Sequence, residues 1–294
     1  MSYVFLVKKD PAFDVVQAGQ MLETKSGTPL RFIRSGELNG NRGGLFLLPD
    51  AEAKDSIRAP VLEKCFDFDV LITDTLPSLK RRGELVLDMD MTSVQIEGID
   101  EIARRLGVYD EVADITSQAM HGGLDFASSL KKRVSLLKDG DASVIEDVRK
   151  IMKETDGLDV LMEITAKAGW QRGICSGGFV QLICVLEQKY HLQMVCANSL
   201  EIVDGRLTGR VDREIVDAEV KRRGVVDLRE REHIDKEQVI VLGDGANDLK
   251  MIAEAGLGIA YHAKPLVQKE APCCINHSDL AAVALLLTLG DEKA

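Results

Sequence analysis

The sequence predicts an α/β protein with a Rossmann-like core and parallel sheet, a helical cap inserted after the first core strand, and a small N-terminal α+β domain. Beyond residue 83, short apolar runs alternate with long amphipathic stretches, which is typical of parallel strands covered by helices on both faces. Residues 98–155 carry helical patterns throughout, whereas residues 1–80 mix strand-like and helix-like segments. We therefore expect domains at 1–80 and 84–294, with the cap at 98–155 inside the second.

The N-terminal segments follow a β-α-β-β-α-β order, which is the order of a ferredoxin-like or ACT-like unit. Strands are expected at residues 3–8, 29–34, 44–48 and 66–73, and helices at 12–23 and 50–59. A unit of this kind suits a regulatory or dimerising role, which the sequence leaves open.

The core segments alternate between apolar strands and amphipathic helices. Buried strands are expected at residues 84–87, 173–175, 193–196, 239–242 and 257–260. Helices are expected at residues 158–168, 179–190, 214–232, 247–255 and 279–289. Because ligands of open parallel sheets bind beyond the carboxyl ends of the strands, the residues that follow each strand are the candidates for chemistry.

Two segments interrupt the alternation. The cap stretch gives no strand signal, and its helices are expected at residues 99–103, 112–120, 126–137 and 144–152. Residues 200–209 are typical of a hairpin, because Asp204-Gly205 suits a two-residue type I′ turn.

Composition limits the classes of function. The 294 residues contain 37 Lys plus Arg and 48 Asp plus Glu, for a formal charge of −11. This acidic excess argues against a general nucleic-acid binder and against a polybasic membrane anchor. No apolar run approaches the roughly 18 residues that span a membrane, and the N-terminal residues lack a signal-peptide pattern. Six cysteines form no CxxC pair, so we expect reduced thiols in a cytoplasmic protein.

The first core strand leads directly into Asp88-Met89-Asp90-Met91-Thr92. Two carboxylates at the end of a buried strand are costly unless a partner compensates them, and Mg²⁺ is such a partner. A carboxylate can also attack phosphorus, while the second protonates the leaving oxygen and later deprotonates water. A cluster that caps the next helix is the structural alternative.

Two further strand ends carry matching groups. Ser176-Gly177-Gly178 offers a hydroxyl and backbone N–H groups at a helix start, which suits an anion. Residues 243–248 (Gly-Asp-Gly-Ala-Asn-Asp) offer two acids, an amide and two glycines, which suit the binding of a metal ion and a phosphate group. They do not form a dinucleotide-binding fingerprint, because Asp248 stands where that motif has its third glycine. Lys221 can supply the missing cation. Together the four groups predict phosphoryl-transfer chemistry, which needs positioning and charge neutralisation.

From about residue 84 to 290, the sequence resembles the phosphoserine phosphatases of the haloacid dehalogenase superfamily. The first strand end resembles their DxDxT motif, Ser176-Gly177-Gly178 their second motif and residues 243–248 their fourth, and Lys221 stands at the spacing of their lysine. Residues 94–101, 123–134 and 258–265 also resemble the family. Met91 departs from it, since many relatives have Ser there.

The resemblance implies a role for each of these positions. It implies that Asp88 is the nucleophile and Asp90 the general acid/base, with Ser176, Gly177, Lys221 and Asn247 at the phosphate. Mg²⁺ would be held by Asp88, the main-chain carbonyl of Asp90, Asp244 and Asp248. The substrate would be recognised through its ammonium by Glu97 and its carboxylate by Arg133, with Met120 and Phe126 closing the pocket.

The implied reaction is Mg²⁺-dependent hydrolysis of O-phospho-L-serine through an aspartyl-phosphate, the last step of serine biosynthesis. One alternative is a related phosphatase or phosphotransferase that acts on phosphothreonine or phosphohomoserine. The non-enzyme alternative is a phospho-receiver or sensory protein, which also uses an Asp, a Lys and Mg²⁺. The expected partner is the small substrate, with neither nucleic acid nor membrane, and a homodimer is compatible with the N-terminal unit.

Overall fold

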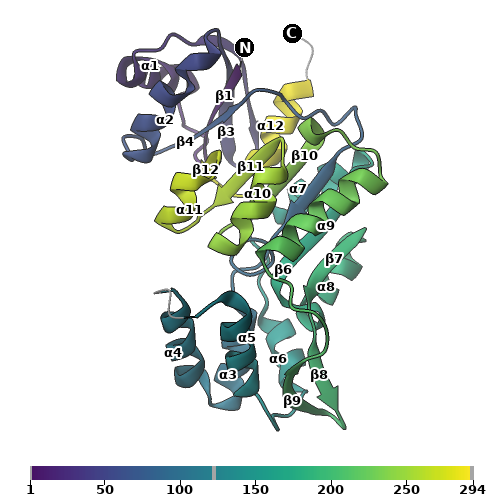
Figure 1. Cartoon of the computed structure of the whole chain (residues 1–294). Helices are drawn as coiled ribbons and strands as arrows, with labels where there is room; N and C mark the ends of the chain where they lie inside the picture. The colour runs from purple at the N-terminus through teal and green to yellow at the C-terminus, as the bar shows by residue number, and fades with distance from the viewer. Residues whose placement is uncertain (1, 121–123, 292–294) are drawn as a thin grey trace.

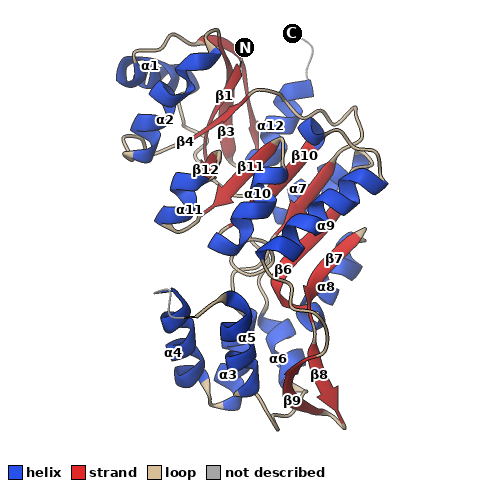
Figure 2. Cartoon of the chain, viewed as in Figure 1, coloured by secondary structure: helices blue, strands red, loops and turns tan. Residues whose placement is uncertain are grey.

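The computed structural model describes residues 2–120 and 124–291. It contains a four-stranded sheet of order β2-β3-β1-β4, a six-stranded sheet of order β12-β11-β10-β5-β6-β7, and a two-stranded hairpin. Figures 1 and 2 show the four-stranded sheet at one end of the molecule, the six-stranded sheet in the middle, and helices α3 to α6 at the other end. The predicted fold class is confirmed.

The N-terminal sheet has the predicted order of elements. These are β1 (Ser2–Lys8), α1 (Val15–Ser26), β2 (Arg31–Leu38), β3 (Asn41–Leu48), α2 (Lys54–Leu62) and β4 (Asp69–Thr73). Every neighbouring pair in this sheet is antiparallel, which is the ferredoxin-like arrangement. The last strand begins at Asp69 and not at residue 66, so the predicted strand was too long at its start.

Both faces of this sheet are buried at β1, which explains why residues 4–7 of that strand are all apolar. Val4 and Leu6 face a cluster that includes side chains of α1 and α2. Phe5 and Val7 belong to the cluster that includes α12 (Ala281–Asp291) from the far end of the chain. Since successive strand residues point to opposite faces, α12 covers the face that the N-terminal helices leave open.

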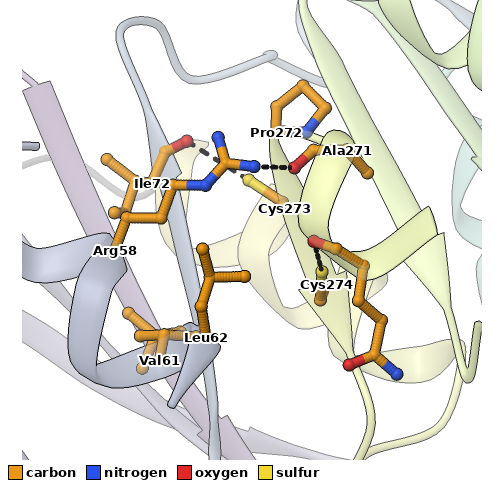
Figure 3. A pocket seen from close by; sticks show the side chains of 10 residues that line it. Arg58, Val61, Leu62, Ile72, Ala271, Pro272, Cys273 and Cys274 are labelled. Atoms are coloured by element: carbon orange, nitrogen blue, oxygen red, sulfur yellow. Dashed lines mark hydrogen bonds between the residues drawn. The ribbon is translucent and has the colours of Figure 1, made fainter. Parts of the chain in front are cut away.

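Hydrogen bonds join the N-terminal sheet and its helices to the edge of the six-stranded sheet. Beside them lies a small cavity of about 20 Å³, which has room for roughly one water molecule (Figure 3). Arg58 of α2 donates at 2.7 Å to the carbonyl oxygens of Lys269 and Ala271. Across the same junction, the buried Asp69 carboxylate accepts from the backbone N–H of Asn276 at 2.6 Å. Asp69 therefore serves the junction between the sheets.

The strands of the six-stranded sheet are all parallel, as predicted. They are β5 (Glu84–Leu87), β6 (Gln171–Phe179), β7 (Met194–Asn198), β10 (Val239–Gly243), β11 (Leu257–Tyr261) and β12 (Cys273–Ile275). Strand β12 was not predicted, because three residues at a sheet edge give no periodic signal. The central position of β5 places the first motif between the motif that follows β10 and the motif in the last residues of β6.

Helices cover both faces of this sheet (Figure 1). They are α7 (Leu158–Lys167), α8 (Val180–Tyr190), α9 (Ala218–Arg231), α10 (Leu249–Glu254), α11 (Pro265–Glu270) and α12. Side chains of α7, α8 and α12 share one apolar cluster with Leu85 and Leu87, and those of α9 and α10 share another with Val86. Helix α9 begins later than predicted, because the Asp217 carboxylate caps it by accepting from the N–H groups of residues 219 and 220.

The helical insertion is present where the sequence predicted it. Its helices are α3 (Gly98–Leu106), α4 (Tyr109–Met120), α5 (Phe126–Ser135) and α6 (Val144–Ile151), called the cap helices below. The predicted hairpin consists of β8 (Leu200–Val203) and β9 (Arg206–Val211), and Asp204 and Gly205 have φ angles of +48° and +76°, as a type I′ turn requires. Within the described ranges, no helix is both long and apolar enough to cross a lipid bilayer.

Candidate active site

Three predicted motifs meet at one edge of the six-stranded sheet. Asp88 follows β5, Ser176 lies in β6, and Asp244 follows β10. Because β10, β5 and β6 are adjacent and parallel, their carboxyl ends lie side by side. The Asp88 N–H donates to the Leu242 carbonyl at 2.9 Å, which extends the pairing of β5 with β10 up to the first acid.

A buried lysine connects the first and fourth motifs. The Nζ atom of Lys221 on α9 lies 2.8 Å from Oδ1 of Asp88 and 2.6 Å from Oδ1 of Asp248. Lys221 and Asp248 are fully buried, and Asp88 is 5% exposed. Burial alone would lower the pKa of Lys221, but the two carboxylates outweigh it and raise that pKa, so the ammonium is held charged. Lys221 therefore holds a positive charge between the acids of the first and fourth motifs.

The acids of the first and fourth motifs form a set that fits a hard cation. Carboxylate oxygens of Asp88, Asp244 and Asp248 lie within 4.8 Å of one another. Burial, together with the neighbouring carboxylates, raises the pKa of Asp244 to about 8 and that of Asp248 to about 6. Such a set of oxygen donors, crowded by like charge that a cation would relieve, suits a divalent hard metal.

Asp90 is positioned differently from Asp88. Its Oδ2 accepts from the backbone N–H of Gly98 at 3.1 Å, while Oδ1 is buried and has no hydrogen-bond partner among the described residues. Burial, and then the charges of Glu97 and Asp88, raise the pKa of Asp90 well above its usual range. The carboxyl group thus favours its protonated form, as a general acid does.

A tight turn follows Asp90 and packs back against the first motif. Met91 adopts a left-handed backbone with φ +57°, and its side chain is 44% exposed. The Ser93 hydroxyl donates to the Asp88 carbonyl at 2.6 Å, and the N–H groups of Ser93 and Val94 donate to the Met89 carbonyl. The departure from the family at Met91 therefore falls on an exposed turn position that leaves the buried acids in place.

The second motif brings core and cap together. The Ser176 side chain is buried, and its Oγ accepts from the Gly178 N–H at 2.9 Å. A Cβ atom at Gly177 would lie 2.8 Å from Cζ of Phe126 and 3.5 Å from Nδ2 of Asn247. Only glycine allows this approach, so three predicted site residues from distant parts of the chain meet here. Met120 ends α4, and its side chain lies outside the described part of the chain.

The cap supplies two opposite charges, Glu97 immediately before α3 and Arg133 on α5. Glu97 is exposed at the surface of the site, yet desolvation by the surrounding protein, followed by Asp100 and Asp88, raises its pKa, whereas Lys264 and Arg133 act in the opposite direction. Burial lowers the pKa of Arg133, against the carboxylates of Asp100, Glu97 and Asp90. The Nε atom of Arg133 has no hydrogen-bond partner among the described residues. An arginine held among acids, with donor capacity remaining, suits recognition of a further carboxylate.

Sequence reasoning missed two charged neighbours of the site. Asp100 lies on α3 and acts electrostatically on both Glu97 and Arg133. A signal existed, since residues three apart on a helix share a face, and Glu97 and Asp100 have that spacing. Lys264, which follows β11 and precedes α11, had no such signal, because the sheet alone brings it toward Glu97.

The chain is similar to known hydrolases over most of its length. The family model described as haloacid dehalogenase-like hydrolase matches residues 66–256. A phosphoserine phosphatase of Haemophilus influenzae is 42% identical over 226 residues, which cover 77% of this chain and 72% of that protein.

Solved structures agree with these sequence matches. The crystal structure of a probable phosphoserine phosphatase from Vibrio cholerae has a TM-score of 0.82 and 33% identity, with 98% of this chain and 87% of that chain covered. A phosphoserine phosphatase solved as an analogue of its phospho-aspartyl intermediate has a TM-score of 0.65 and 38% identity, with 69% and 98% covered. The chain therefore belongs to the haloacid dehalogenase-like hydrolases and, within them, to the phosphoserine phosphatase family.

Proposed function

We propose that the protein hydrolyses O-phospho-L-serine to L-serine and inorganic phosphate. The observation that carries this proposal is the contact of the Lys221 ammonium with Asp88 and Asp248, at 2.8 and 2.6 Å. It places a fixed positive charge beside a nucleophilic carboxylate at the edge of the sheet where Ser176 and Asp244 also lie. Phosphoryl transfer needs such positioned charge more than it needs reactive side chains.

Asp88 is the nucleophile of the proposed reaction. Its carboxylate attacks phosphorus, the bond from phosphorus to the serine oxygen breaks, and an aspartyl-phosphate forms. Lys221, the Ser176 hydroxyl, the Gly177 N–H and the Asn247 amide bind the phosphoryl oxygens as their charge develops. The relative solved as a phospho-aspartyl intermediate analogue supports this sequence of steps.

Asp90 moves the protons in both halves of the reaction. In the first, its protonated carboxyl donates to the departing serine oxygen, which would otherwise leave as an alkoxide. In the second, the carboxylate takes a proton from the water that attacks phosphorus, the bond from phosphorus to the Asp88 oxygen breaks, and inorganic phosphate leaves. The raised pKa of Asp90, whose Oδ1 is buried without a hydrogen-bond partner among the described residues, supports this role.

Mg²⁺ is the metal that we propose for the acidic set. Asp88, the main-chain carbonyl of Asp90 and Asp244 would hold it, with Asp248 in support. Their oxygen ligands and mutual repulsion fit this hard cation. When bound, Mg²⁺ supplies positive charge against the phosphate oxygens.

The cap residues distinguish phosphoserine from simpler esters. Glu97 attracts the substrate ammonium, and Arg133 binds its carboxylate with the fork geometry of a guanidinium. Phosphothreonine and phosphohomoserine carry the same two groups and therefore remain alternative substrates. They differ from phosphoserine by one methyl or methylene group, which a pocket discriminates by roughly 1–3 kcal/mol.

The direct test is phosphate release by the full chain with Mg²⁺ and after chelation with EDTA. The substrates are phosphoserine, phosphothreonine, phosphohomoserine and p-nitrophenyl phosphate. We expect phosphoserine to give the highest kcat/KM and EDTA to abolish turnover reversibly. Equal kcat/KM for phosphoserine and p-nitrophenyl phosphate would contradict the proposed specificity, and a stable phosphoprotein without phosphate release would indicate the receiver alternative.

The N-terminal domain at residues 1–80, the phosphatase domain at 84–294 and the cap at 98–155 remain a proposed division. A regulatory or dimerising role of the first domain is likewise a proposal, as is the cytoplasmic location. The ferredoxin-like sheet supports the first two points. Deletion of residues 1–80 tests them through kinetics, the response to serine and the molecular mass in solution.

A further inference from the structure

The Asp90 carboxyl group lies between two glycines that belong to different parts of the fold. Gly98, the first residue of cap helix α3, donates its N–H to Oδ2 of Asp90 at 3.1 Å. On the core side, a Cβ atom at Gly178 would lie 3.3 Å from the same Oδ2. Among the described residues, the Gly98 N–H is the donor that binds the Asp90 side chain, and Oδ1 of Asp90 has no partner.

The N–H group that binds Asp90 lies at the first position of a helix, where it has no acceptor within the helix. The first N–H groups of an α-helix have no acceptor within the helix. Glu97 precedes α3 as its N-cap, in extended conformation (φ −94°, ψ 110°), and makes no side-chain capping bond. The N–H of Gly98 is therefore directed to Asp90, and the residue before it carries the proposed ammonium-binding carboxylate.

Packing explains why this position is glycine. A Cβ atom at Gly98 would lie 2.6 Å from Cδ1 of Leu182 on α8, which is closer than real Cβ atoms approach. It would lie 3.5 Å from Oδ1 of Asp90, an ordinary van der Waals distance. Leu182, and not Asp90, therefore excludes a side chain here, so the steric constraint can be removed without touching the acids.

We propose that Gly98 is a positioning residue for the reaction: its backbone N–H orients the Asp90 carboxyl toward the leaving oxygen. The inference rests on the proposed function of Asp90 as the general acid/base. One short cap segment, Glu97-Gly98, then serves both ends of the substrate. Glu97 binds the ammonium, and Gly98 orients the group that protonates the ester oxygen.

The test uses a background in which Leu182 is replaced by Ala, so that position 98 accepts a side chain. In that background, Gly98→Ala keeps the N–H and Gly98→Pro removes it. Proline is well tolerated at the first helical position, and the extended backbone of Glu97 suits a following proline. The two double variants therefore differ at the hydrogen bond to Asp90.

The readout is kcat/KM, which reports formation of the phosphoenzyme, for phosphoserine and for p-nitrophenyl phosphate. The serine alkoxide needs a proton to leave, whereas nitrophenolate does not. Relative to Gly98→Ala/Leu182→Ala, we expect Gly98→Pro/Leu182→Ala to lose about tenfold to a hundredfold on phosphoserine and less than threefold on p-nitrophenyl phosphate. Asp90→Asn should show the same selectivity with a larger loss.

Equal losses on both substrates, or no loss on phosphoserine, would overturn the inference. A second comparison does not depend on proline: Gly98→Ala alone should lose activity selectively on phosphoserine, and Leu182→Ala should restore it. An unselective loss, or a failure of this rescue in a folded protein, also contradicts the proposal. If the wild-type protein rejects phosphoserine, the proposed function fails, and ethyl phosphate then serves as the alkyl ester that tests Gly98.

Discussion

The two ends of strand β5 carry buried carboxyl groups with opposite surroundings. Asp88 follows the carboxyl end of the strand, and its Oδ1 lies 2.8 Å from the Lys221 ammonium. Glu84 begins the strand and is fully buried, yet neither of its side-chain oxygens has a hydrogen-bond partner among the described residues. Burial raises the pKa of Glu84 to about 8, and Arg229 and Arg231 oppose this increase from a distance.

Helix α9 carries basic residues near both Asp88 and Glu84, and their contacts explain why the two carboxyl groups differ. It directs Lys221 into contact with Asp88, but its two arginines near Glu84 bond elsewhere, Arg229 to Glu254 and Arg231 to Glu232. Burial alone therefore does not make a catalytic carboxylate. The carboxyl end of the strand becomes a site because partners from several loops converge there, whereas the amino end holds a carboxyl that favours its neutral form.

The largest effect is expected at the carboxyl end. Asp88→Asn keeps an oxygen that can accept from Lys221 but removes the nucleophile. We expect kcat for phosphoserine to fall by at least about 10³-fold while the protein stays folded. Phosphate release measures the loss, and circular dichroism verifies the fold. Substantial residual turnover would contradict the assignment of Asp88.

Removing the cation between the acids should destabilise the protein. Lys221→Met leaves Asp88 and Asp248 buried without their shared counterion, and we expect unfolding free energy to fall by about 3–5 kcal/mol. Urea denaturation measures the change. The control is Lys167→Met, which removes a 72% exposed lysine paired with Glu163 and should cost less than about 1 kcal/mol. A similar loss of unfolding free energy in both variants would show that burial does not strengthen the ion pairs of Lys221 with Asp88 and Asp248.

At the amino end, removing the charge should stabilise the protein. The pKa of Glu84 rises from 4.5 to about 8 on folding, so the folded state binds the proton more tightly. The contribution of Glu84 to the free energy of unfolding of the wild type therefore decreases as the pH rises from about 4.5 to 8, and it is constant above that range. We expect Glu84→Gln to match the wild type near pH 4.5 and to exceed it by about 2–3 kcal/mol at pH 8.5.

Urea denaturation at both pH values checks this expectation, and phosphate release should stay within about twofold of the wild type, since Glu84 lies at the opposite end of β5 from Asp88. A Glu84→Gln protein that is less stable than the wild type at pH 8.5 would show that the carboxylate has a favourable partner. The two ends of β5 would then be alike, and the comparison would fail.

The smallest effect is expected in the cap. Arg133→Ala removes the proposed carboxylate clamp, and kcat/KM for phosphoserine should fall about tenfold to a hundredfold. Phosphoethanolamine, which has the ammonium but no carboxylate, should change less than about threefold. Lys132→Ala, an exposed neighbour on α5, is the matched control. Equal losses on both substrates would exclude Arg133 as the clamp.

The sequence predicted much of the fold because most elements have local signals. The apolar runs that precede Asp88, Ser176 and Asp244 marked three strand ends, and the parallel arrangement then implied that these residues meet. Strand β12 and helix α11 escaped prediction, since three and six residues are too short for a period to show. The predicted residues 66–68 of the fourth strand were wrong because the alternation continues beyond the paired backbone.

By itself, the sequence determined the order of elements, the motifs at the strand ends and the family. These properties depend on neighbouring residues, where hydrophobic period and turn chemistry act over a few positions. Only the tertiary structure decided that α12 covers the N-terminal sheet, that Leu182 leaves no room for a side chain at position 98, and that no described residue hydrogen-bonds to the Glu84 side chain. Such contacts join residues far apart in the chain, so packing and not local pattern determines them.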